Sequence, residues 1–277
     1  MQLRVGLIQT TTPATQAAAL AHAAPLVRQA ATAGAQLIVT PEGTNLLERD
    51  PAALSPRLAS LDEDAAVVGL RGLAVELSVW ILIGSALVRR EDGKAANRAA
   101  LISPAGEITA TYDKLHMFDV DLPTGETARE SATYEPGDRA VTAEAAGVRL
   151  GLSICYDVRF PALYRALALA GAQVMTVPAA FTRPTGEAHW EVLLRARAIE
   201  TGSFVLAAGQ GGFHEDGRGT WGRTLAVSPW GEVLGKLDHD EPGVLMVDLD
   251  LAAVDAARRA IPALANARPF AAPGDAA

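Results

Sequence analysis

The only cysteine of the chain, Cys155, lies where the nucleophile of an acyl-transfer enzyme is expected. The apolar run at residues 149–154 predicts a buried strand, and residues 161–170 predict a helix with proline in its first turn. A thiol at the turn between them projects from the end of a sheet, with the backbone N–H of Tyr156 beside it. The alternative is a buried cysteine that packs as a small apolar side chain, which is the commoner role of a free cysteine.

A thiol at neutral pH needs a base or a nearby cation, because its ordinary pKa of about 8.5 leaves it mostly protonated. Glu42 follows a short apolar strand predicted at residues 37–40, at the kind of strand end where α/β sheets place ligands, and would act as general base. Lys114 follows a strand predicted at residues 107–111 and would supply positive charge to an oxyanion. Taken singly, the two residues also fit an exposed loop glutamate and a surface lysine.

Histidine offers an alternative base for Cys155, since an imidazole paired with a thiol is the arrangement of papain-like proteases. His116 and His189 are the candidates, and their spacing does not exclude either. His189 opens a segment, residues 189–200, whose apolar positions have helical spacing, so we interpret it as a helix-start residue. The glycine cluster at residues 209–212 lacks the pattern of a phosphate loop or a dinucleotide fingerprint and is interpreted as a flexible turn.

Three arginines, Arg159, Arg183 and Arg195, are candidates for pairing with a substrate carboxylate, because a guanidinium binds a carboxylate through two hydrogen bonds. Structural ion pairs explain them equally well. Phe181 and Thr182 follow a second proline-terminated strand and are predicted to border the substrate pocket as part of an apolar wall.

The elements that must position these residues are predicted from a repeated motif. The sequence Ala-Gly-Ala-Gln-Leu-Ile-Val-Thr-Pro at residues 33–41 returns as Ala-Gly-Ala-Gln-Val-Met-Thr-Val-Pro at residues 170–178. Each copy follows a predicted helix, the first at residues 16–33, and Gly34 and Gly171 are expected in the left-handed conformation that ends a helix. The two halves therefore share a local plan, unless two alanine-rich stretches match by chance.

Strands and helices alternate along the chain, beginning with a strand at residues 4–9, which indicates an α/β fold. Residues 219–235 indicate two strands around a turn, and residues 244–249 indicate another strand. Because no linker-like segment interrupts the chain, we expect one α/β domain at residues 1–270, built from two sheets with helices outside, and a flexible tail at residues 271–277.

The composition excludes several classes of protein. The 277 residues include 49% hydrophobic and 20% charged side chains and carry a net charge of -8, so a globular chain without a footprint for nucleic acid is expected. No apolar run approaches the roughly 20 residues that cross a bilayer, and the N-terminus has no signal-like leader, which predicts a cytoplasmic protein with no membrane partner. A single cysteine and scattered histidines predict neither a disulfide framework nor a metal site.

Three motifs, in order along the chain, closely resemble those of the nitrilase superfamily of carbon–nitrogen hydrolases. They are Pro-Glu-Gly at residues 41–43, Tyr-Asp-Lys-Leu-His-Met-Phe-Asp at residues 112–119, and Gly-Leu-Ser-Ile-Cys-Tyr-Asp-Val-Arg-Phe-Pro at residues 151–161. The similarity extends from about Leu3 to Phe270. It implies a four-layer α-β-β-α sandwich that acts without a cofactor and assembles as a homodimer or a larger even homo-oligomer.

The resemblance also implies roles for individual residues. Glu42, Lys114 and Cys155 match the family's catalytic triad, and Glu130 matches a second glutamate that supports the site. Ala162 departs from the glutamate that commonly follows Cys-Tyr-Asp-x-Arg-Phe-Pro, which leaves the triad intact and the details of the substrate pocket open.

Within the superfamily, the chain is most similar to the branch that contains deaminated glutathione amidase and omega-amidase. We therefore expect a cysteine-dependent amidase that hydrolyses the amide C–N bond of a small carboxylated substrate through a thioester and releases ammonia, with deaminated glutathione as the preferred substrate. Amides similar to α-ketoglutaramate, N-carbamoyl amides and nitriles are the alternative substrates. A non-catalytic binding or scaffold protein is the alternative of a different class.

Overall fold

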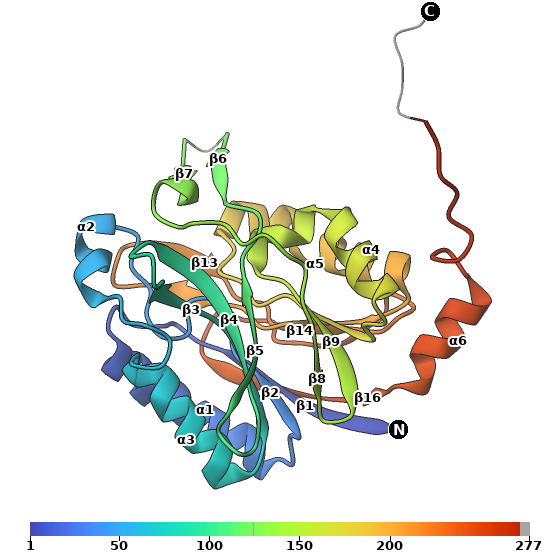
Figure 1. The fold of residues 1–277 in the computed structure, drawn as a ribbon, viewed down its shortest axis with the longest axis horizontal. Helices are drawn as coiled ribbons and strands as arrows, with labels where there is room; N and C mark the ends of the chain where they lie inside the picture. The colour runs from blue at the N-terminus through green and yellow to red at the C-terminus, as the bar shows by residue number, and fades with distance from the viewer. Residues whose placement is uncertain (124, 272–277) are drawn as a thin grey trace, which may run out of the picture.

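Two six-stranded sheets form the centre of the computed structural model, which describes residues 1–123 and 125–271 (Figure 1). The first sheet contains, in spatial order, β16 (Gly243–Asp250), β1 (Gln2–Gln9), β2 (Leu37–Val39), β3 (Trp80–Arg89), β4 (Ala95–Ile102) and β5 (Ile108–Asp113). The second contains β8 (Thr142–Ala145), β9 (Val148–Leu152), β10 (Val174–Thr176), β11 (Phe204–Ala207), β14 (Leu225–Val227) and β15 (Val233–Lys236). Two small sheets pair β6 (Asp119–Asp121) with β7 (Thr127–Arg129) and β12 (Gly211–Phe213) with β13 (Gly219–Trp221).

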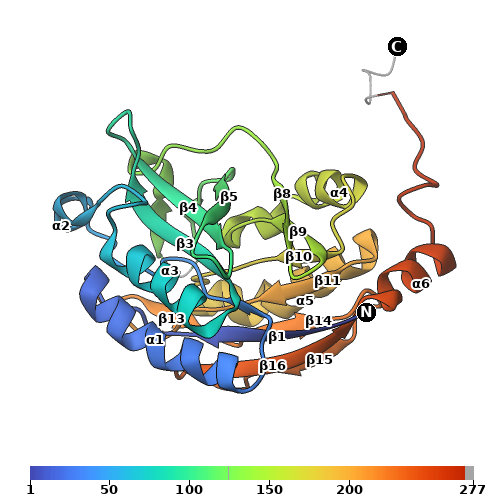
Figure 2. The ribbon, with the colours of Figure 1, turned by 60° about the horizontal axis from the view of Figure 1, so that its bottom comes forward.

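Helices cover the outer face of each sheet. Figure 1 shows α1 (Gln16–Thr32) and α3 (Ala65–Leu77) against the first sheet, and α4 (Pro161–Leu169) and α5 (Arg183–Thr201) against the second. The remaining helices are α2 (Pro51–Leu54), α6 (Ala252–Ala260) and the 3₁₀ helices Ser55–Arg57, Glu130–Ala132 and Cys155–Arg159. Figure 2 shows α6 beyond the layers, near the start of β1. The expected four-layer α-β-β-α sandwich is confirmed.

Side-chain alternation along the strands explains why the sheets are stacked and covered. In β2, Leu37 and Val39 point into the core between the two sheets, where they share a cluster with Leu150 and Leu152 of β9. Ile38 points the opposite way and packs in the second cluster, under α1 and α3. Successive residues of a strand face opposite sides, so a strand buried on both faces is apolar at every position.

The two sheets repeat one plan. Each has a trio of parallel strands, β1-β2-β3 and β9-β10-β11, with one antiparallel strand on one side and two on the other. β2 and β10, the strands of the repeated sequence motif, occupy the same central place. Gly34 and Gly171 both have the predicted left-handed conformation, with φ of 89° and 90°. The repeated motif therefore reflects a structural repeat.

Three local predictions are wrong. α5 begins at Arg183, so His189 lies inside the helix and does not start it; Thr182 is the N-cap and Pro184 lies in the first turn. The glycine cluster is not a flexible turn either, because Gly211 and Gly212 pair in β12 and Gln210 between the glycines is fully buried. Residues 219–235 contain three strands and not the predicted two, because the chain turns at Gly222 and Arg223, both of positive φ, between β13 and β14. The other predicted strands and helices are present, with shifts of a few residues at their ends.

The described residues form a single α/β domain, as predicted. Most of the predicted tail, residues 272–277, lies outside the described residues. In the part of the chain that the structure describes, no helix combines the length and the apolar character that crossing a membrane requires.

Candidate active site

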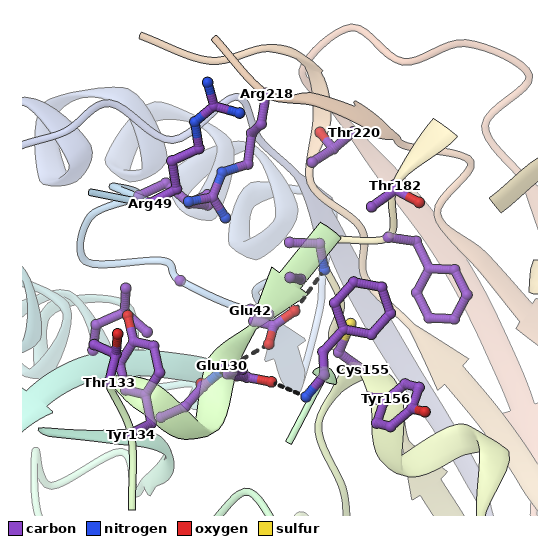
Figure 3. A pocket seen from close by; sticks show the side chains of 18 of the residues that line it. Glu42, Arg49, Glu130, Thr133, Tyr134, Cys155, Tyr156, Thr182, Arg218 and Thr220 are labelled. Atoms are coloured by element: carbon purple, nitrogen blue, oxygen red, sulfur yellow. Dashed lines mark hydrogen bonds between the residues drawn. The ribbon is translucent and has the colours of Figure 1, made fainter. Parts of the chain in front are cut away.

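Four of the predicted residues, Glu42, Lys114, Glu130 and Cys155, line one pocket; Figure 3 labels Glu42, Glu130 and Cys155. Glu42 follows β2 after a proline, Lys114 follows β5 directly, and Cys155 begins the 3₁₀ helix after β9. Glu130 begins the 3₁₀ helix after β7 and completes the group. The Nζ of Lys114 lies 2.9 Å from Glu42 Oε1 and 2.8 Å from each carboxylate oxygen of Glu130. The Cys155 thiol and the Glu42 carboxylate line the same cavity, and Glu42 is close enough to the thiol to raise its pKa.

Burial makes the charges of this group strongly interdependent. Lys114 is only 2% exposed, and burial alone lowers the pKa of a lysine, but Glu130 and Glu42 raise it well above its usual range. Burial tends to raise the pKa of Glu42, yet the Lys114 charge and the hydrogen bonds that the carboxylate accepts hold it below its usual range. Burial and the Glu42 charge raise the pKa of the Cys155 thiol well above its usual range, against the opposing charge of Lys114. The resting site therefore holds an ammonium, an ionised Glu42 and a neutral thiol.

The backbone at Cys155 is held in an unusual conformation. Its φ is 50°, in the left-handed region that costs a non-glycine residue about 1–3 kcal/mol. Its N–H donates to the carbonyl of Pro178, 2.8 Å away, at the end of the second copy of the repeated motif. Tyr156 follows in the same 3₁₀ helix. The turn after β9 is therefore fixed by β10, and the thiol points to the edge where β2 ends.

Asp157, which the sequence analysis did not single out, ties the Cys155 turn to the loop after β5. Its side chain is fully buried. Oδ2 accepts hydrogen bonds from the N–H of Ile154 at 2.9 Å and the hydroxyl of Tyr112 at 2.7 Å, and Oδ1 accepts one from the N–H of His116 at 3.1 Å. A buried carboxylate with several donors is a strong structural anchor. An acid two residues after the cysteine was visible in the sequence, but its partners were not.

The histidine alternative does not fit the structure. The Nδ1 of His116 lies 2.6 Å from Asp157 Oδ1, and its ring stacks on Phe160 with centroids 3.5 Å apart. His189 lies on α5, with Nδ1 3.3 Å from both terminal nitrogens of Arg159. Both imidazoles are engaged elsewhere, whereas the Glu42 carboxylate is close enough to the thiol to raise its pKa.

Asn97 on β4 is a second residue that sequence reasoning missed. Its Nδ2 donates to Glu42 Oε1 at 2.8 Å and to Glu130 Oε1 at 3.2 Å, while the N–H of Ala180 donates to Glu42 Oε2 at 2.8 Å. Both oxygens of Glu42 are thus oriented. The available signal was an asparagine inside the otherwise mostly apolar strand at Ala95–Ile102, because buried polar groups on strands require partners.

We expect Asn97→Ala to lower turnover by about 10- to 100-fold, because hydrogen bonds to a charged group contribute roughly 1.5–3 kcal/mol. Asn97→Asp is expected to be more harmful, since it places a third carboxylate against Glu42 and Glu130 and raises the pKa of Glu42. Steady-state kinetics across pH on both variants check this, with thermal unfolding as the control for folding. Equal turnover in Asn97→Ala and the wild type would remove the positioning role.

Gln210 supports the Glu42 loop from the other side. Its Nε2 donates to the backbone carbonyl of Glu42 at 2.9 Å and to Thr12 Oγ1 at 2.7 Å, and its side-chain oxygen accepts from Thr10 Oγ1 at 3.1 Å. The glycines that flank it, Gly209 and Gly211, leave no room for a Cβ, which would meet backbone atoms at 2.9 Å and 2.1 Å. The glycines of this cluster are therefore needed because only they allow the backbone to approach closely enough for Gln210 to contact the Glu42 loop.

A cavity of about 340 Å³ opens onto Cys155. Phe181 and Thr182 line it, as predicted, together with Tyr156. This volume falls at the lower end of the range for small-molecule sites. Within residues 1–123 and 125–271, no three histidine, cysteine or acidic side chains gather in a way that could hold a metal ion.

The arginines predicted to bind a substrate carboxylate do not line this cavity. Arg183 pairs with Asp240 and lies over the ring of Phe213, with 4.5 Å between its guanidinium carbon and the ring centre. Arg159 lies over the rings of Tyr156 and Phe181, and Arg195 donates to a backbone carbonyl. Arg183 and Arg195 thus form the ion pairs that were the alternative interpretation, whereas Arg159 contacts aromatic rings and His189.

Comparisons with known proteins give the family of this fold and site. The chain is 41% identical to deaminated glutathione amidase of Yersinia enterocolitica over 238 residues, which cover 85% of this chain and 82% of that protein. It is 35% identical to human omega-amidase, covering 96% of this chain and 95% of that protein. The crystal structure of the NitFhit protein of C. elegans superposes with a TM-score of 0.88 at 30% identity, covering 96% of this chain and 65% of that longer protein. The carbon-nitrogen hydrolase family model matches residues 4–259, so the chain belongs to the carbon–nitrogen hydrolase family and is a hydrolase of carbon–nitrogen bonds other than peptide bonds.

Proposed function

We propose that this hydrolase is an amidase that cleaves small carboxylated amides through a thioester on Cys155. The observation that carries the proposal is that the Cys155 thiol and an ionised Glu42 line the same cavity, with a buried Lys114 holding Glu42 in place at 2.9 Å. A thiol of raised pKa is a poor nucleophile until its proton is removed. Glu42 is positioned to remove it.

In the first half-reaction, Glu42 takes the thiol proton while the sulfur attacks the amide carbon. The carbonyl oxygen becomes an oxyanion, and the Lys114 ammonium and the backbone N–H of Tyr156 stabilise it. The C–N bond then breaks, and the leaving nitrogen takes the proton back from Glu42. The product of this step is a thioester and a free amine, or ammonia if the substrate is a primary amide.

In the second half-reaction, Glu42 takes a proton from a water molecule that attacks the thioester carbon. The sulfur leaves and recovers the proton, which gives a carboxylic acid and the original enzyme. Glu130 touches neither sulfur nor substrate in this scheme. It holds Lys114 through two contacts of 2.8 Å, and its Oε2 also accepts a short hydrogen bond of 2.6 Å from the N–H of Phe118. All groups in these steps belong to this chain or to water.

Deaminated glutathione is the substrate that we propose first, because a relative named deaminated glutathione amidase is 41% identical to this chain over 238 residues. An α-ketoglutaramate-like amide is second, because the omega-amidase relative is 35% identical. The two substrates release different groups. Glutathione without its amino group has no primary amide, so its cleavage releases a cysteinyl amine. The ammonia release expected from the sequence therefore applies to α-ketoglutaramate and not to deaminated glutathione.

The test is hydrolysis of deaminated glutathione, α-ketoglutaramate, an N-carbamoyl amino acid and a nitrile, with acid and amine products measured by mass spectrometry. We expect Cys155-dependent turnover of deaminated glutathione above that of the others. Faster turnover of another of these compounds would change the proposed substrate and leave the proposed thioester mechanism in place. Absence of turnover and of any covalent adduct on Cys155 would favour the alternative of a binding or scaffold protein.

The predicted assembly and location are part of the same proposal. An even-numbered homo-oligomer is expected from the resemblance. The molar mass of the purified protein, measured by light scattering, checks it, and the mass of a monomer would contradict it. A cytoplasmic location is the other part of this proposal.

A further inference from the structure

Three arginines that the proposed chemistry does not use line the cavity that contains Cys155, and two of them, Arg49 and Arg218, lie in loops outside the β6–β7 hairpin. Arg49 lies in the segment between β2 and α2, and Arg218 lies in the turn between β12 and β13. Figure 3 shows the two side chains running past each other in opposite directions, on the far side of Glu42 from Cys155. Arg49 reaches the turn that carries Arg218. If Gly217, the residue before Arg218, had a Cβ, that atom would lie 3.6 Å from the Nη2 of Arg49. Loops that are far apart in sequence thus bring two guanidinium groups to one end of the cavity.

Arg218 is oriented by a nearly buried carboxylate. Asp216, whose side chain is 1% exposed, accepts from the Nε of Arg218 at 2.7 Å and from its backbone N–H at 3.0 Å, and its Oδ2 lies 2.7 Å from Nη2. These contacts use one edge of the guanidinium. The edge that includes Nη1 stays available, and a guanidinium binds a carboxylate best through two nitrogens of one edge.

Arg49 supplies the net positive charge of this end. In the part of the chain that the structure describes, no carboxylate lies within 4.0 Å of its guanidinium, and the residue is exposed. The other cations of the cavity wall are paired: Lys114 with two glutamates and Arg129 with Asp121. Among the acidic wall residues, Glu48 is paired with Arg57, and Glu126 is exposed at the β6–β7 hairpin. Arg49 is therefore the wall cation best able to gain a new anionic partner.

The end of the cavity beside Cys155 carries a net negative charge. Glu42, Glu130 and Lys114 sum formally to one negative charge beside Cys155. A substrate carboxylate is repelled there, while a neutral amide is not. The field along the cavity thus favours one orientation of a carboxylated amide, with the amide at Cys155 and the carboxylate at the two arginines.

We propose that Arg49 and Arg218 form a carboxylate-binding subsite that anchors the end of the substrate distant from the scissile amide and selects carboxylated amides over neutral ones. Asp216 is a positioning residue that fixes Arg218. The subsite replaces the arginines expected from the sequence, which are engaged outside the cavity. This inference rests on the proposed amidase function for its catalytic consequence, but binding at the subsite does not require turnover.

The kinetic test compares each carboxylated amide with its methyl ester. Glutaramate carries the carboxylate on the acyl part, and N-butyrylglycine carries it on the amine part. We expect Arg49→Gln to lower kcat/KM for the carboxylated member by about tenfold or more, mainly through KM, and to change the ester less than about threefold. If the glutaramate pair shows this selective loss, the acyl part of the substrate reaches the subsite; if the N-butyrylglycine pair shows it, the amine part does. Arg129→Gln, which alters a wall arginine that is already paired, is the matched control.

A binding measurement separates this inference from the proposed function. Titration calorimetry in the Cys155→Ala background measures the affinity for glutaramate, N-butyrylglycine and their esters without turnover. We expect at least one acid to bind more tightly than its ester, and Arg49→Gln and Arg218→Gln each to reduce that preference. A preference that is absent in the Cys155→Ala protein, or unchanged by both substitutions, overturns the subsite whatever the turnover result. Preference without turnover in the wild type supports the subsite and refutes the amidase.

Discussion

Replacing Cys155 with alanine is expected to abolish turnover while the fold remains. The expected loss is at least about 10⁴-fold, because no other group in the site can form the acyl intermediate and removal of a nucleophile has effects of this size or larger. The fold should persist because the small side chain is replaced by a smaller one, and the backbone strain at φ of 50° is common to cysteine and alanine. Steady-state kinetics and thermal unfolding on the same preparation measure both effects.

The matched control is Cys155→Ser, which keeps a hydroxyl of similar shape beside Glu42. It should fold like the wild type and remain nearly inactive, because the serine hydroxyl is far less acidic and less nucleophilic than a thiol. Rapid quenching of the wild type with substrate should give a protein mass increased by the acyl group, located on Cys155. Retention of more than a tenth of the wild-type rate in a folded Cys155→Ala protein would contradict the thioester mechanism.

Replacing Glu42 with glutamine is expected to separate two properties of Cys155 that usually change together. The amide cannot accept the thiol proton, so amide turnover should fall by about 10²- to 10⁴-fold. At the same time the substitution removes a negative charge that raises the thiol pKa, while the Lys114 charge that lowers it remains. The thiol pKa should therefore fall, and a larger fraction of thiolate should be present at neutral pH.

The measurement is the pH dependence of Cys155 alkylation by iodoacetamide, followed by mass spectrometry alongside the kinetics. In Glu42→Gln the alkylation curve should move to lower pH although turnover is lost. Glu126→Gln is the control, because Glu126 is exposed at the cavity wall. An alkylation curve that moves to higher pH, or turnover within tenfold of the wild type, would be incompatible with Glu42 as the general base.

The same charges set the pH profile of the wild type. The pKa of Glu42 is held below its usual range by Lys114 and by hydrogen bonds, despite burial. Turnover that requires the carboxylate is present above this pKa and is lost as pH falls through it. The acid limb of kcat/KM should therefore lie at a lower pH than the usual titration of a glutamate.

The sequence was sufficient for the fold, and it named four residues, Glu42, Lys114, Glu130 and Cys155, that the structure brings together. Apolar runs ending in Pro41 or before Cys155 predicted the buried strands, and the repeated motif around Gly34 and Gly171 anticipated two sheets of one plan. Local signals suffice here because strands buried on both faces are apolar throughout, and a helix that ends before such a strand needs a glycine of positive φ.

Partners across the sheets could not be predicted in this way. Asn97, Asp157 and Gln210 hold the site through contacts with residues at least 30 positions away or with backbone groups, and nothing local marks them as partners. The start of α5 was misplaced because its first turn, at Arg183, has few apolar residues to reveal helical spacing. Periodicity reports which face of an element is buried, but not what lies opposite.

By itself, the sequence determined the α/β sandwich, the family and the identity of Glu42, Lys114 and Cys155 as the residues of interest. Only the tertiary structure decided which charges meet. It placed Arg159 and Arg183 in structural contacts outside the cavity and brought Arg49 and Arg218 together within it. The physical reason is that secondary structure follows from local patterns, whereas the charge and shape of a cavity depend on loops that approach one another only when the sheets stack.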